Sequence, residues 1–187
     1  NYTHSCFNYL KIEFLQLENQ KLRKLIDENI SSEEILAKVL IDKDSPFLKS
    51  IILNKGSKDS VKAGMGVIDG VYLVGQIIEV NYTNSRALLL SDLNSKIPSV
   101  LAPKNIQAVI SGTGKNFGKI EHTKDDIKDD LKDKDVIIYT SGLGGIFKPG
   151  IPIGKISKDN QKRVNFFSDF TQLDYVKIIS FKIGDIK

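Results

Sequence analysis

The chain has 187 residues, and its 27 Lys and Arg against 23 Asp and Glu give a formal net charge of +4. This length fits one ordinary domain or two small ones. The hydrophobic and charged fractions of 41% and 27% argue against a disordered or fibrous chain. No apolar run approaches the ~18 residues that a membrane-spanning helix needs.

Residues that carry metal and cofactor chemistry are scarce in this sequence. Cys6 is the only cysteine, which excludes an internal disulfide and cysteine-based metal clusters. The two histidines are His4 and His122, and only three of the basic residues are arginine. Proteins that read nucleic acids usually favour the planar, bidentate arginine side chain. We therefore expect no metal, no cofactor and no nucleic-acid partner.

Residues 1–29 contain no Gly or Pro, and apolar side chains recur there at helical spacing. One series alternates steps of three and four residues, as the a and d positions of a coiled coil do. Its members are Ile12, Leu15, Asn19, Leu22 and Ile26. An Asn at an a position is best satisfied by its counterpart on a parallel partner, so the series predicts a dimerisation helix. A single amphipathic helix lying on its own domain is the alternative.

The segment 30–44 has two interpretations. Ser31 and Glu34 have the spacing of a capping box, which predicts a helix over residues 35–41. The same stretch, rich in Ile, Leu and Val, also suits a short buried strand, because periodicity does not separate the two at this length. The local sequence leaves this choice open.

From Ser50 onward, the sequence predicts antiparallel β-structure. Short apolar runs alternate with Gly, Asn, Asp and Ser at the intervals expected of sandwiches or barrels, and no helix-length crossover separates them. The runs are Ile51–Leu53, Gly66–Ile68, Val71–Val80, Arg86–Leu90, Ile106–Ile110, Val136–Thr140, Ile151–Ile156, Arg163–Phe167 and Tyr175–Phe181. A faint repeat relates the sequence around Gly75 to that around Gly154, which suggests two small barrels of similar build.

The search for catalytic groups yields no catalytic residue. The segment 111–115 resembles a phosphate-binding loop but lacks the Gly and the Ser or Thr that the motif requires. Ser141 lies in a Gly-rich run, and His122 is its only candidate base outside the helix, in a charged stretch. The Asp-rich segment 124–135 lacks the ligand spacing of a calcium loop.

A Gly- and Pro-rich loop over residues 144–154 contains several large apolar side chains, three of which are candidates for partner binding. These three are Ile146, Phe147 and Ile151. Pro removes ladder hydrogen bonds and Gly marks bends, so this segment is not regular sheet throughout. We consider it either a barrel corner packed on its own core, which is the favoured interpretation, or a partner-binding loop.

Several segments, in one order from about Leu15 to Gly154, resemble the rod shape-determining protein MreC family. The most specific is Thr140-Ser141-Gly142-Leu143-Gly144-Gly145-Ile146-Phe147 with Gly150-Ile151-Pro152-Ile153-Gly154. The others include Ser45–Ser50, Asn54–Ser57, Val61–Met65, Val74–Ile77 and Ser85–Asp92. The resemblance implies a coiled-coil helix followed by two small antiparallel β-barrels, and so a mainly β fold.

The same resemblance implies a non-enzymatic scaffold of the bacterial cell-elongation complex. Its partners would be a class B penicillin-binding transpeptidase, MreD and MreB, besides a second copy of the chain. It would lie at the periplasmic face of the inner membrane, with its single membrane helix upstream of this sequence. The alternatives are a glycan- or peptide-binding barrel module and a degenerate serine-hydrolase-like pair of barrels.

We expect four segments: a dimerisation helix over 1–29, a linker and first strand over 30–44, a first barrel over 45–98 and a second over 99–187. The resemblance favours a strand over residues 35–41 that joins the C-terminal barrel.

Overall fold

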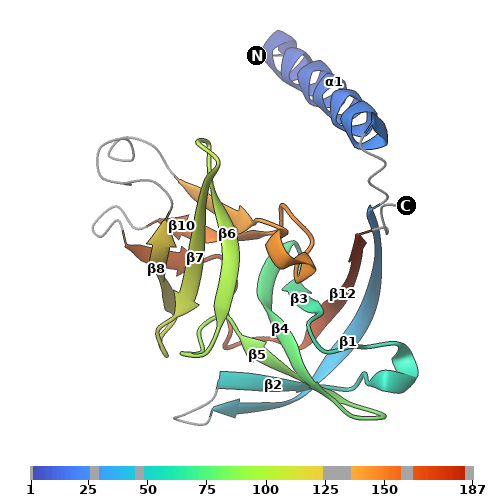
Figure 1. Cartoon of the computed structure of the whole chain (residues 1–187), viewed down its shortest axis with the longest axis vertical. Coiled ribbons are helices and arrows are strands. Elements are labelled where there is room, and N and C mark those ends of the chain that lie inside the picture. Colours follow the sequence, from blue (N-terminus) through green and yellow to red (C-terminus); the bar gives the residue numbers. More distant parts are fainter. Residues whose placement is uncertain (1, 26–29, 45–48, 124–135, 157–161, 184–187) are drawn as a thin grey trace. The chain divides into compact units, whose positions relative to one another are not determined.

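The structure is a computed structural model that describes residues 2–25, 30–44, 49–123, 136–156 and 162–183 (Figure 1). The chain divides into two units. The first holds residues 1–31 with 182–187, and the second, a compact unit, holds residues 32–181.

Helix α1 (Tyr2–Leu25) confirms the expected N-terminal helix. Its described apolar side chains are all exposed, including Ile12 and Leu15 of the predicted a and d series. The side chains of Asn19 and Leu22, and the whole of Ile26, lie outside the described residues. Pairing of this helix with a second copy therefore stays a prediction.

Within the described residues, twelve strands form two closed antiparallel barrels, which confirms the expected fold class (Figure 1). The first barrel contains β1 (Ile30–Asp44), β2 (Lys49–Leu53), β3 (Gly66–Asp69), β4 (Tyr72–Val80), β5 (Ser85–Leu89) and β12 (Tyr175–Ile183). The second contains β6 (Lys96–Ala102), β7 (Ile106–Gly112), β8 (Phe117–Thr123), β9 (Ile137–Thr140), β10 (Pro152–Ile156) and β11 (Arg163–Phe166). Two short 3₁₀ turns, η1 (Ser57–Asp59) and η2 (Leu143–Gly145), lie between strands.

The alternation of buried and exposed residues along the strands builds the core. In β5 and β6, for example, every second side chain is buried, as expected when one face of a strand lines a barrel interior. The fully buried large side chains are Ile51, Leu53, Leu73, Ile77, Leu90, Leu101, Ile110, Ile138, Ile153 and Ile178. Branched aliphatic residues dominate this set because they fit the pleated, closely packed interior of a small barrel.

The two barrels share one strand order. Around the first barrel the strands follow β1-β2-β5-β4-β3-β12, and around the second β7-β8-β11-β10-β9-β6. The faint repeat in the sequence has a structural counterpart here. Gly75 in β4 and Gly154 in β10 occupy equivalent strands, and a Cβ would stand 2.1 Å from the Leu88 carbonyl oxygen in one case and 2.3 Å from that of Asn165 in the other. Glycine at both positions allows the neighbouring strand to approach closely.

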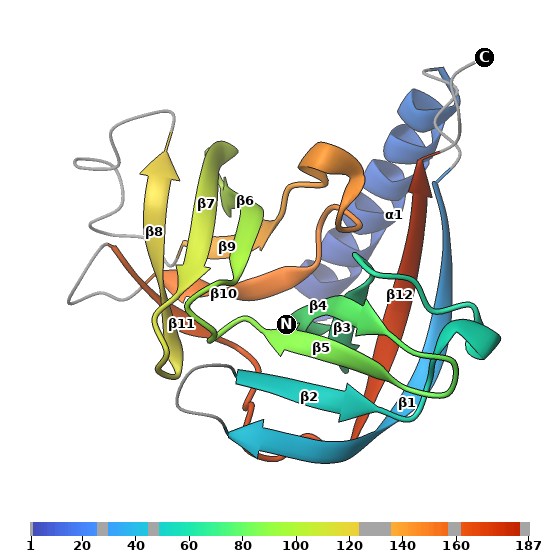
Figure 2. The same cartoon turned by 60° about the horizontal axis from the view of Figure 1, so that its bottom comes forward.

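Strand pairing corrects the expected boundaries of the barrels. β1 does not join the C-terminal barrel, and β12 does not belong to the second barrel, because the two strands lie side by side and close the first (Figure 2). The Val39 amide donates to the Asp174 carbonyl at 2.9 Å, and Lys177 Nζ lies 2.7 Å from a Glu34 carboxylate oxygen. The first barrel therefore combines residues from both ends of the compact unit.

Residues 35–41, left open by the sequence, belong to strand β1. Leu36, Lys38 and Leu40 are exposed, whereas Ala37 between them is buried, which is the period of two that a strand requires. The Asn54 amide donates to the Lys38 carbonyl at 3.1 Å. Hydrogen bonding to neighbouring strands thus outweighs the local capping signal.

Candidate interaction surfaces

The segment that links the two barrels, between β5 and β6, is short and is held by hydrogen bonds around Asp92. Asp92 is buried, and its carboxylate accepts hydrogen bonds from the Lys49 amide at 2.7 Å and the Asn94 amide at 2.8 Å. Lys49 opens β2 of the first barrel. In the second barrel, the amide of Gly114, which lies between β7 and β8, donates to the Ser91 carbonyl at 2.8 Å. The link is therefore hydrogen-bonded to both barrels, which belong to one compact unit.

The Gly- and Pro-rich loop between β9 and β10 is closed by Thr140. The Thr140 hydroxyl donates to the Lys148 carbonyl and accepts from the Ile151 amide at 2.9 Å. The Thr140 carbonyl also accepts from the Gly150 amide at 2.9 Å. These bonds join the two ends of the loop, so its apolar side chains are held in fixed positions.

The three candidate side chains of this loop separate in the structure. Phe147 is 2% exposed and lies against Gly66 of the first barrel, and Ile151 is also buried. Ile146 is 39% exposed, and Leu143, three residues earlier and not singled out by sequence reasoning, is also exposed. Phe147 thus packs between the barrels. Partner binding by this loop remains a prediction, with Leu143 and Ile146 as its accessible apolar side chains.

A second apolar surface lies on the outside of the first barrel and was missed by sequence reasoning. Leu36 and Leu40 of β1 are exposed, and so is Tyr175 at the start of β12. Lys38 Nζ lies 5.9 Å from the centre of the Tyr175 ring. The alternation of Glu34, Leu36, Lys38 and Leu40 was the available signal, but it becomes readable only once the segment is known to be a strand.

The rim of this outer surface is charged. The ion pair with Lys177 holds the pKa of Glu34 below its usual value, because the ammonium group donates a hydrogen bond to the carboxylate and stabilises its ionised form. An apolar patch with a charged rim is the usual anatomy of a protein–protein interface. We name Leu36, Leu40 and Tyr175 the outer patch.

The structure describes only some of the residues considered for catalysis. Ser141 Oγ accepts a hydrogen bond from the Leu143 amide at 3.2 Å, as in a turn stabilised by serine. The side chain of His122 lies outside the described set, as does the acidic segment 124–135. The segment 111–115 forms the end of β7 and the turn toward β8.

The described residues contain neither a metal-binding cluster nor a membrane-spanning helix. No group of three or more His, Cys, Asp and Glu side chains there is placed to hold a metal ion. Within the same residues, the helix falls short of the combined length and apolar character that crossing a membrane requires.

Comparison with known proteins places this fold in a family. The family model "Rod shape-determining protein MreC, barrel core" matches residues 39–180. The chain belongs to the MreC family. Its similarity to the cell shape-determining protein MreC of Cereibacter sphaeroides is 33% identity over 172 residues, covering 88% of this chain and 56% of the relative. The chain thus spans about half the length of that MreC protein.

Solved MreC structures share the fold. MreC from Listeria monocytogenes superposes with a TM-score of 0.76 at 23% identity, covering 96% of this chain and 91% of that one. The major periplasmic domain of a cell shape-determining MreC filament gives 0.70 at 20% identity, with coverages of 82% and 99%. MreC from Helicobacter pylori, solved in complex with the penicillin-binding protein PBP2, gives 0.60 at 13% identity, covering 83% and 100%.

Proposed function

We propose that this chain is a non-enzymatic scaffold of the bacterial cell-elongation machinery that binds a class B penicillin-binding transpeptidase outside the cytoplasmic membrane. The observation that carries the proposal is the pair of exposed apolar surfaces on a compact two-barrel unit, in a family with a member solved in complex with PBP2. Apolar side chains held at fixed positions lose little entropy on binding, which favours recognition of a preformed partner surface.

Contacts between the barrels support a scaffold role. Asp92 pins the linking segment, and Phe147 of the second barrel packs on Gly66 of the first. Ser168, which follows β11, also donates through its hydroxyl to the Leu73 carbonyl of the first barrel at 3.3 Å. A scaffold acts by holding its partners at a defined separation, so a body without a loose hinge between its two halves suits the task.

The exposed helix supports a homodimer. The described apolar side chains of α1 stay accessible on the single chain, and Ile12 and Leu15 occupy heptad positions. Pairing two helices along this seam removes those side chains from water. A dimeric scaffold presents two copies of each barrel surface. MreD and MreB would be further partners of the same scaffold.

The experiment is a binding assay between this chain and the extracytoplasmic region of its own class B transpeptidase. We expect a complex with the wild-type chain. Leu36→Glu with Leu40→Glu tests the outer patch, and Leu143→Glu with Ile146→Glu tests the loop. At least one pair weakens binding tenfold or more, because each places charge in an apolar contact. Tyr82→Glu, at the exposed turn after β4, is the control and leaves binding unchanged. No binding by the wild-type chain contradicts the proposal.

A further inference from the structure

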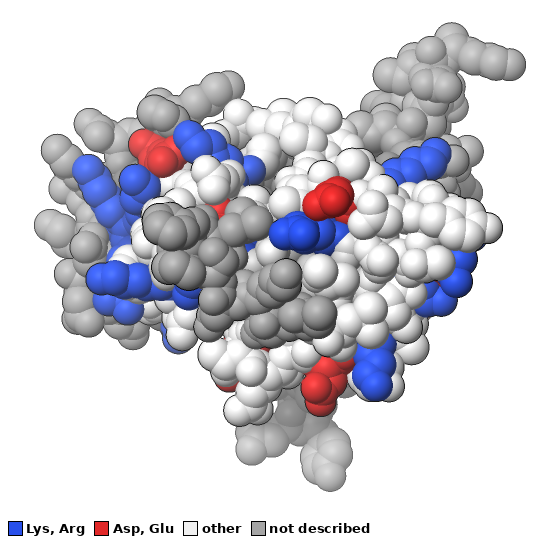
Figure 3. Space-filling view, turned by 90° about the horizontal axis from the view of Figure 1, so that it is seen from below, with Lys and Arg blue, Asp and Glu red and all other residues white. Residues whose placement is uncertain are grey.

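The positive charge of the chain is concentrated in the second barrel. Residues 96–166 contain thirteen Lys and Arg against eight Asp and Glu, whereas the rest of the chain has fourteen against fifteen. Six of those eight acids lie in the segment 124–135, outside the described residues. Among the described residues of the second barrel there are eight Lys and Arg and a single acidic residue, Glu121. Figure 3 shows the basic side chains gathered at the left, over this barrel.

Four of these cations lie on one outer face, which we name the cationic face: Lys96, Lys119, Lys155 and Arg163, all exposed. Lys119 and Arg163 are directly paired across β8 and β11. Lys119 and Lys96 are each paired with Ser111 of β7, which lies between them. Lys155 of β10 pairs with Asn165, two residues beyond Arg163. With ~4.8 Å between neighbouring strands, Lys96 and Arg163 are roughly 14 Å apart.

Local contacts hold these side chains over the strands. The Arg163 guanidinium carbon lies 4.1 Å from the centre of the Phe117 ring, a favourable cation–π contact. Glu121 bridges two of the lysines, with carboxylate oxygens 3.2 Å from Lys96 Nζ and 3.6 Å from Lys119 Nζ. Hydrogen bonds from Lys96 and Ser111 lower the pKa of Glu121 and keep it ionised. One carboxylate among four cations leaves the face with a clear positive excess.

The shape of the face indicates the kind of ligand. The cations stand on the outer surface of adjacent strands and are spaced along it, so they do not converge on one small anion as groups in a pocket do. Three of the four are lysines, which act as point charges and not as bidentate forks that select one acceptor geometry. A broad, laterally distributed anionic surface matches this arrangement better than a discrete site.

We propose that the cationic face docks on the anionic headgroups of a phospholipid bilayer, bringing the second barrel against the membrane surface. The proposal rests on the proposed function for one condition, that the chain works beside a membrane. Basic side chains near an anionic bilayer gain electrostatic attraction that falls off within a Debye length, so contact requires the face to lie flat on the headgroups. The barrel itself does not insert.

The test is co-sedimentation of the chain with vesicles of equal parts phosphatidylglycerol and phosphatidylcholine, compared with pure phosphatidylcholine. We expect binding to the anionic vesicles alone, weakening as salt is raised. Each basic residue at such a surface contributes about fivefold to the partition coefficient. Replacing three of them, Lys119→Gln, Lys155→Gln and Arg163→Gln, should therefore lower it at least tenfold. The matched control removes the same charge from the first barrel, with Lys38→Gln, Lys58→Gln and Lys62→Gln, and keeps binding.

Charge-conserving variants, thermal melts and a soluble polyanion serve as controls. Lys119→Arg with Lys155→Arg retains the charge and should bind as wild type, and thermal melts check that every variant is folded. Binding that survives the three substitutions, or that is equal on neutral vesicles, overturns the proposal. Capture by soluble poly-glutamate without binding to anionic vesicles also overturns it and assigns the face to an acidic protein. Transpeptidase binding, measured without lipid, reports separately on the proposed function.

Discussion

The ring of Phe147 lies against Gly66, close enough that a Cβ at Gly66 would stand 3.3 Å from Phe147 Cδ1. The two residues belong to different barrels, since Gly66 begins β3 and Phe147 precedes β10. The Gly-rich loop of the second barrel therefore closes over the first. This contact explains why a large aromatic side chain in an irregular loop is buried.

Phe147→Ala should destabilise the two-barrel unit strongly. Removing a buried aromatic ring typically costs about 3–5 kcal/mol, because contacts are lost and the cavity closes only in part. Ile146→Ala, in the same loop and partly exposed, should cost less than about 1.5 kcal/mol and serves as the control. Urea unfolding followed by circular dichroism measures both. Equal losses for the two variants would contradict the placement of Phe147 between the barrels.

Substitution of the equivalent glycines Gly75 and Gly154 should destabilise the two barrels in the same way. At Gly75 and Gly154 a Cβ would meet a neighbouring carbonyl oxygen at 2.1 and 2.3 Å, so Gly75→Ala and Gly154→Ala must displace main chain. Each should cost about 3 kcal/mol or more. Gly70→Ala is the control: its φ is +58°, but nothing lies near its Cβ position, so strain of about 1–2 kcal/mol is expected. If denaturant unfolding ranked Gly70→Ala as the most destabilising variant, it would contradict the close approach of neighbouring strands at Gly75 and Gly154.

The apolar seam of α1 predicts self-association. Leu15 occupies a heptad d position and is exposed in the single chain, so Leu15→Glu places a charge where two helices would meet. We expect the wild-type chain to dimerise with increasing concentration and Leu15→Glu to weaken that dimer at least tenfold. Gln16→Glu, adjacent in the helix but outside the heptad series, adds the same charge and should leave the dimer intact. Sedimentation equilibrium distinguishes these outcomes, and a wild-type chain that stays monomeric contradicts the seam.

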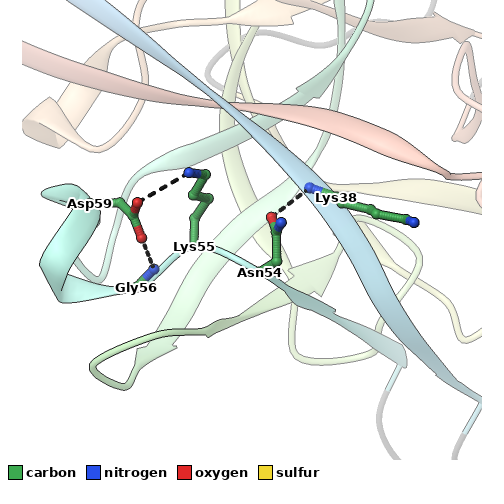
Figure 4. A network of polar contacts seen from close by, with 5 residues as sticks. All are labelled: Lys38, Asn54, Lys55, Gly56 and Asp59. Atoms are coloured by element: carbon green, nitrogen blue, oxygen red, sulfur yellow. Dashed lines mark hydrogen bonds and ion pairs between the residues drawn. The ribbon is translucent and has the colours of Figure 1, made fainter.

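Asp59 predicts a pH-dependent contribution to stability (Figure 4). The pKa of Asp59 is lowered first by the hydrogen bond from the Gly56 amide, 3.2 Å away, and then by Lys55 Nζ at 3.1 Å. Because the folded pKa lies below the unfolded value of about 3.9, ionised Asp59 favours the folded state. This contribution is complete above pH ~4 and disappears as the pH falls through the lowered pKa.

The difference in urea midpoint between wild type and Asp59→Ala should therefore be larger at pH 7 than near pH 2. Asp69→Ala removes a carboxylate from the last residue of β3 and serves as the reference for loss of charge alone. A difference between wild type and Asp59→Ala that grows toward acid would have the wrong sign for this interaction.

The sequence predicted most strands because alternation and turn residues are local signals. It missed β6, where Pro98 interrupts an otherwise suitable run. Pro98 lies just beyond the last β6–β9 pair, Ser99 with Thr140, and its carbonyl accepts a hydrogen bond from the Ser141 amide at 3.1 Å. The sheet therefore tolerates a proline at this end of the β9 ladder. It also missed β8, in which Gly118 and alternating polar residues weaken the apolar pattern. In both strands, pairing with neighbours decides the structure.

The assignment of strands to barrels was not predictable from local patterns. β1 and β12 lie near opposite ends of the sequence, and they close the first barrel by pairing with each other. Only this pairing shows to which barrel they belong. The same limit applies to the candidate surfaces. Phe147 and Ile146 are adjacent and similarly apolar, yet one is buried and the other accessible, because the loop turns one of them toward Gly66. The outer patch became visible only when residues 35–41 were seen as a strand.

The most direct test of the proposed scaffold role is the mass of the proposed complex, measured by size-exclusion chromatography with light scattering. This chain is mixed with the extracytoplasmic region of its class B transpeptidase at concentrations where the helix is paired. The account predicts one species holding two copies of each protein, and a species with one copy of each when Leu15→Glu is used. Separate elution of the two wild-type proteins over the whole concentration range would contradict it.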